Sequence, residues 1–140
     1  DEHLLEILCA KISSDVMVFH RALDLSNNPL ESGQLLQDFG ICSVLSSGGA
    51  PAAGLGIGML KDLTDLGLHV VAGGGVRIED VSTLGEVGVE AVHASCRLKT
   101  LSESLKHIDD GLFDLTTYPV DFTKALQLTE EVLKWNEHEK

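Results

Sequence analysis

Positively charged residues are scarce in this chain of 140 residues. Ten lysines and arginines stand against 22 aspartates and glutamates, which gives a formal net charge of −12. Because so acidic a surface repels a phosphate backbone and an anionic lipid surface, we expect no binding to nucleic acid or to membranes. The sequence also has no apolar run long enough to span a bilayer, and no basic-then-apolar opening typical of a secretion signal.

Cysteine is rare as well. Cys9, Cys42 and Cys96 are odd in number, far apart and in no C-x-x-C motif, so we expect reduced thiols rather than a disulfide framework. Reduced thiols predict a cytoplasmic protein. The chain lacks low-complexity tracts, and 44% of its residues are hydrophobic. A chain of this size therefore predicts one folded unit over residues 1–140.

The chain has only three arginines, and their positions are informative. Four apolar segments each run into a polar or glycine-rich turn: Val16–Ala22, Ser43–Gly49, His69–Gly75 and Ala91–Arg97. Arg21, Arg77 and Arg97 each lie within two residues of the end of one such segment. The guanidinium group offers a planar fork of donors that suits carboxylate or phosphate. We therefore predict a site for a small anion at these strand ends.

Helical patterns alternate with the four segments. They cover residues 1–11, 29–39, 56–66, 78–87 and 122–137, and the second begins with an Asn28-Pro29 cap. Strands that alternate with helices predict an α/β fold with a parallel sheet, and nearly continuous apolar strands are typical of a sheet covered on both faces. Residues 98–119 fit this pattern least. We expect an irregular excursion there, with weak helical character around 101–108.

Two architectures fit four strand–helix units. One is a doubly wound sheet, and the other is a TIM-type barrel, of which four units are half of the eight. We favour the barrel portion. Because half a barrel leaves two open sheet edges, it predicts either a missing N-terminal half or a homo-oligomer.

The third and fourth segments carry the clearest site signals. Gly73, Gly74 and Gly75 lie between a strand and a helix, where bare backbone can approach an anion, although a tight turn without a ligand would look the same. Loops after the last two strands of a barrel commonly bind phosphate. Alternation along the fourth strand would place three polar side chains on one face: His93, Ser95 and Arg97. His93 is accordingly a candidate acid or base, with a satisfied core histidine as the alternative.

The first two segments add further candidates. His20 and Asp24 could act as an acid–base pair, or Asp24 could instead pair with Arg21 as a structural ion pair. Ser47 and Gly48 supply a hydroxyl and a bare amide to a ligand-contacting turn.

Read in order, the motifs FHRA with a nearby aspartate, SSG, GGG and H-x-S-x-R make residues 16–97 resemble the CutC family of copper homeostasis proteins. The resemblance implies a (β/α)8 barrel, of which this stretch would be strands five to eight. It places these residues at the barrel mouth: His20, Arg21, Asp24, Ser47, Gly73–Gly75, His93, Ser95 and Arg97. The cysteines that family members are thought to use for copper(I) belong to the N-terminal half, which this chain lacks. Cys96 is the candidate ligand for a copper ion here.

Three functions remain open at this point. The chain could be a CutC-like protein of copper homeostasis that binds copper(I). It could instead be a barrel enzyme that acts on a small phosphorylated or carboxylated metabolite, with a histidine that transfers a proton. Or it could be a structural half-barrel that pairs with another chain through its open edges.

Overall fold

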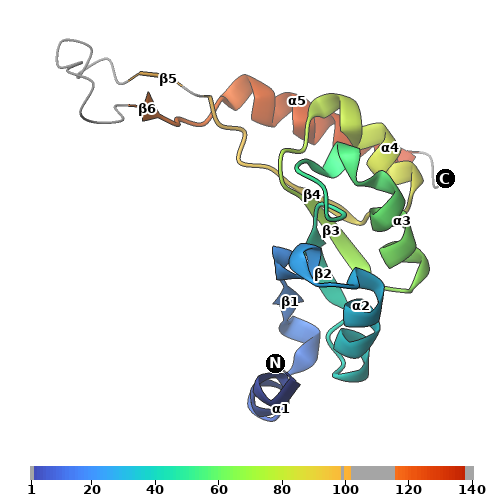
Figure 1. The fold of residues 1–140 in the computed structure, drawn as a ribbon. Helices are drawn as coiled ribbons and strands as arrows, with labels where there is room; N and C mark the ends of the chain where they lie inside the picture. The colour runs from blue at the N-terminus through green and yellow to red at the C-terminus, as the bar shows by residue number, and fades with distance from the viewer. Residues whose placement is uncertain (1, 99, 102–115, 138–140) are drawn as a thin grey trace.

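A four-stranded parallel sheet forms the centre of the protein (Figure 1). The computed structural model describes residues 2–98, 100–101 and 116–137. The strands are β1 (Val18–Phe19), β2 (Ser43–Ser46), β3 (His69–Gly73) and β4 (Ala91–His93), and they lie side by side in sequence order. A doubly wound sheet reverses its strand order at a switch point, whereas a barrel adds each strand beside the last. The order thus confirms the α/β barrel portion that the sequence predicts.

The helices are α1 (Glu2–Cys9), α2 (Pro29–Asp38), α3 (Ile57–Asp65), α4 (Val81–Glu86) and α5 (Phe122–Leu133). Helix α1 precedes the first strand, whereas α2, α3 and α4 follow strands and lie on one side of the sheet with α5 (Figure 1). Helix α2 begins where expected, because the side chain of Asn28 accepts a hydrogen bond from the Glu31 backbone N–H at 3.4 Å. No described helix has the length and apolar character needed to cross a membrane.

The core lies between these helices and one face of the sheet. Val44 and Val70 of that face are fully buried, as are Leu60 and Leu63 of α3 and Leu84 of α4. Register brings the inward side chains of neighbouring strands level with one another, since Val44 pairs with Val70 and Ala72 with Val92. Burial of these aliphatic side chains is the main force that holds the sheet against its helices.

The opposite face of the sheet is uncovered by the described residues. Leu45 and Val71 are only half-buried there, and Val18 at the β1 edge is 57% exposed. In a closed barrel this is the face that points to the interior. The expectation of cover on both faces is therefore wrong for the described part of the chain.

Two of the predicted strands are shorter than expected. β1 ends at Phe19, and the backbone continues as a 3₁₀-helix over Arg21–Leu25. β4 ends at His93, and Cys96 three residues later has a φ of +47°, a left-handed conformation that ends extended backbone. The simple alternation predicted for the residues from 93 to 97 therefore does not hold.

The ends of the expected excursion run antiparallel to each other. The Leu98 backbone N–H donates to the Pro119 carbonyl at 2.9 Å, and β5 (Thr100–Leu101) pairs with β6 (Thr116–Thr117). Most of the segment with expected helical character, at 101–108, lies outside the described residues. The chain then enters α5, which crosses beside α4 (Figure 1).

Helix α5 is anchored at its far end. Leu128 is 9% exposed, and the Trp135 indole N–H donates to the Val81 carbonyl at 3.1 Å. Gly85 of α4 leaves room for that indole, because a Cβ there would lie 2.6 Å from the ring nitrogen. These contacts fix the start of α5 near the carboxyl end of the sheet.

Candidate functional site

A cleft of about 580 Å³ lies at the carboxyl ends of β3 and β4. Leu45 and His93, from the uncovered face of the sheet, help to line it. Its lining includes all three arginines and one lysine, namely Arg21, Arg77, Arg97 and Lys124, while no aspartate or glutamate is among the described lining residues. In a chain with a net charge of −12, four of the ten lysines and arginines meet here. The cleft lining is thus positively charged, whereas the protein as a whole is negatively charged.

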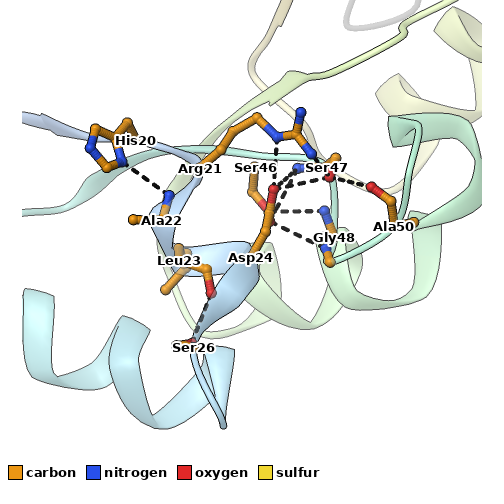
Figure 2. Close-up of polar contacts among 11 residues, drawn as sticks. His20, Arg21, Ala22, Leu23, Asp24, Ser26, Ser46, Ser47, Gly48 and Ala50 are labelled. Carbon is orange, nitrogen blue, oxygen red and sulfur yellow. Dashed lines mark hydrogen bonds and ion pairs between the residues drawn. The ribbon is translucent and has the colours of Figure 1, made fainter.

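Three contacts hold Arg21 in place, and Figure 2 shows the first two, with Asp24 and Ser47. Its Nε donates to Asp24 Oδ2 at 2.9 Å, and its Nη2 donates to Ser47 Oγ at 2.8 Å. The guanidinium also lies against Gly74, where a Cβ would come within 2.6 Å of Nη1. The glycine of the third segment therefore makes room for an arginine of the first.

Asp24 is the centre of a dense hydrogen-bond cluster. Besides Arg21, its carboxylate accepts from Ser46 Oγ at 2.5 Å and from the backbone N–H groups of Ser47 and Gly49 at 3.0 and 3.2 Å. The side chain is only 5% exposed. Burial by itself would raise the pKa of Asp24, but the hydrogen bonds from Ser46, Arg21 and Ser47 outweigh it and lower the pKa to about 2. Asp24 is therefore an ionised anchor for Arg21.

His20 lies apart from this cluster. Its ring accepts a hydrogen bond from the Ala22 backbone N–H at 3.0 Å (Figure 2). The ring is exposed and lies at a tilt to the Phe19 ring, with the two centroids 5.5 Å apart. It does not line the cleft. Within the described residues Asp24 binds Arg21 rather than His20, so the alternative of an ion pair is the one that forms.

Ser47 and Gly48 build the cluster and do not line the cleft. Both Ser46 and Ser47 are fully buried, and Ser47 Oγ also lies 2.7 Å from the Ala50 carbonyl. Gly48 has a φ of +69°, and its N–H donates to Ser46 Oγ at 2.9 Å. The SSGG turn that the sequence assigns to the ligand therefore faces Asp24.

The remaining candidates do meet at the cleft. Gly74 and Gly75 line one wall, and the segment from His93 to Arg97 lines the other. Gly73 lies beneath it, buried against the Leu45 side chain, which a Cβ would approach to 2.5 Å. His93, Ser95 and Arg97 are all exposed to the cleft, although Ala94 and Cys96 line it too.

Comparison with known proteins identifies the family. The CutC family model matches residues 1–98. The chain belongs to the CutC family. It is 31% identical over 132 residues to a family protein CutC from Edwardsiella ictaluri, which covers 83% of this chain and 52% of that protein. A family protein CutC from Yersinia enterocolitica is 32% identical over 100 residues, with 69% and 39% covered. The chain thus spans about half the length of these relatives or less.

CutC membership implies a link to copper homeostasis at the level of the family. Copper(I) favours soft thiolate ligands. Cys96 is buried at the cleft and His93 is exposed beside it, but within the described ranges no three His, Cys, Asp or Glu side chains are placed to hold a metal ion. One thiol and one imidazole do not make a closed copper site, so the described donor set does not fit a resident copper ion.

Two site residues of this CutC chain escape the sequence analysis. Ser46, whose hydroxyl donates to Asp24, is not among the predicted site residues. No sequence pattern marks Lys124 as a site residue. It lies 27 positions after the cleft-lining Arg97 and reaches the cleft only because α5 packs against α4. Long-range docking of this kind leaves no local pattern in a sequence.

Proposed function

We propose that the cleft binds a small anionic metabolite through a phosphate or carboxylate group, with His93 as the group beside it that can accept or donate a proton. The observation that carries the proposal is that four cationic side chains of an acidic protein line one cleft, with no acidic side chain among its described lining residues. Several positive charges in one concave site attract anions and raise their local concentration. The Gly74–Gly75 turn also lines the cleft, and backbone N–H groups of such turns are donors for anion oxygens.

The support for Arg21 as a ligand-binding residue is its rigidity. The cluster around Asp24 fixes the guanidinium before any ligand arrives, and its side chain is still 42% exposed. A preorganised donor loses little conformational freedom on binding, so each hydrogen bond to the anion contributes more to affinity.

Calorimetric titration with inorganic phosphate tests the proposal. Arg97→Gln removes a charged donor from the cleft, and we expect it to weaken phosphate binding about tenfold, which corresponds to about 1.4 kcal/mol. Lys61→Gln is the matched control, since it makes the same change of net charge at an exposed residue that pairs with Asp65 outside the cleft. Equal affinities for the two variants would contradict the proposal.

Copper(I) binding is the competing function, and the same protein distinguishes it. Binding of copper(I) through Cys96 would be lost in Cys96→Ser and would tolerate Arg97→Gln. Anion binding should show the reverse dependence, because no thiol takes part in it.

A further inference from the structure

We propose that Lys124, delivered by helix α5, makes the cleft selective for doubly charged anions such as phosphate monoesters. This inference rests on the proposed function and names the substrate class of the same site. It concerns a residue outside the stretch that the family model matches, which ends at residue 98.

The first step is the charge balance among the four cations. Arg21 is neutralised by Asp24 at 2.9 Å, and Arg77 lies 3.8 Å from Glu79. Arg97 and Lys124 have no ion pair or side-chain hydrogen bond with any other described residue, and both line the cleft. Two positive charges are therefore left uncompensated, and a ligand with two negative charges balances them where a singly charged ligand leaves one unmatched.

The second step is that the two free cations are held close to each other by backbone contacts. The Asp121 N–H donates to the Cys96 carbonyl at 2.8 Å, and Arg97 forms an antiparallel bridge with Val120. Asp121 in turn caps α5, because its Oδ1 accepts from the Lys124 backbone N–H at 3.1 Å. The residues that carry the two charges thus belong to one hydrogen-bonded unit.

The third step is that packing of α5 holds the segment that carries Lys124 in a fixed position relative to the sheet. Leu128 and Trp135 fix α5 against α4, as described above, so the Lys124 backbone has a defined place at the wall of the cleft. Lys124 is half-buried, which reduces the screening of its charge by water relative to an exposed lysine. A fixed, partly desolvated cation is the kind that distinguishes ligand charge.

Sulfate and methanesulfonate test this selectivity because they have similar shapes and carry two charges and one charge, respectively. We would measure both affinities by calorimetry at constant pH and ionic strength. The wild-type chain should bind sulfate more tightly. Lys124→Gln should weaken sulfate about tenfold and change methanesulfonate by no more than about twofold. Lys124→Arg should restore the preference.

Lys134→Gln is the matched control, since Lys134 follows α5 and pairs with Glu131 outside the cleft. It should behave as wild type. Equal weakening of both anions by Lys124→Gln, or no effect on either, would overturn the role of Lys124 while anion binding stands. Failure of the wild-type chain to bind either anion would overturn the proposed function and this inference with it.

Discussion

At the scale of single residues, Asp24 organises the site without lining the cleft. Its carboxylate fixes Arg21 on one side and the Ser46–Gly49 turn on the other, with 5% of the side chain exposed. The site therefore depends on a buried charge that is satisfied by hydrogen bonds, and removal of that charge leaves several donors without an acceptor.

Acid should weaken the fold through Asp24. Its pKa is about 2 in the folded protein against an ordinary 3.8, so its contribution to stability is present above about pH 4 and is lost as the pH falls towards 2. The shift corresponds to about 2 kcal/mol. We expect Asp24→Asn to unfold at lower urea concentration at pH 7, and the difference from wild type to shrink as the pH falls from 4 to 2. A difference that is constant over this range would contradict the role of Asp24.

At the scale of elements, the turn after β3 is shaped by an arginine from another segment. Gly74 has a φ of +100°, and its missing Cβ leaves the space that the Arg21 guanidinium occupies. The turn thus needs glycine both for its backbone conformation and for its neighbour.

Gly74→Ala should therefore affect stability and binding together. The left-handed backbone makes alanine unfavourable by about 1–2 kcal/mol, and the new methyl group displaces Arg21, so phosphate affinity should fall several-fold. Gly58→Ala is the control, because Gly58 in α3 has open space around it and alanine favours a helix there. Urea unfolding and phosphate titration of both variants check this. Unchanged phosphate affinity in Gly74→Ala would contradict the role of this turn in positioning Arg21 for binding.

Most elements were predictable because their signals are local. The Asn28 cap and the glycines after helices mark the boundaries of the helices, and apolar runs mark the strands. The short β1 and β4 were not, since the 3₁₀-helix at Arg21 and the left-handed Cys96 are set by tertiary contacts. The three arginines could be assigned to one rim because each lies close to the end of a strand segment in the sequence. The burial of Ser47, the exposure of His20 and the position of Lys124 at the cleft depend instead on long-range packing.

At the scale of the whole molecule, the sheet presents an uncovered apolar face and, among the described strands, two edges at β1 and β4. Such surfaces bind other strands or apolar partners. We propose that a second copy of the chain packs against this face.

Light scattering over a dilution series should therefore show a mass above 15.0 kDa that falls on dilution. Val18→Asp places a charge on the open β1 edge and should reduce the association. Leu133→Asp is its control, because Leu133 is equally exposed, at 57%, but lies on α5. A constant monomer mass at all concentrations would contradict self-association.

The central claim is that the cationic cleft binds a small anion, and the most direct measurement is an NMR titration of the backbone amides with inorganic phosphate. We predict saturable shifts at Gly74, Gly75, Ser95 and Arg97, with little change at Gly40 and Gly67, and saturation only at about tenfold higher phosphate in Arg97→Gln. Absence of saturation, or shifts scattered over the surface with the cleft unchanged, would contradict the account.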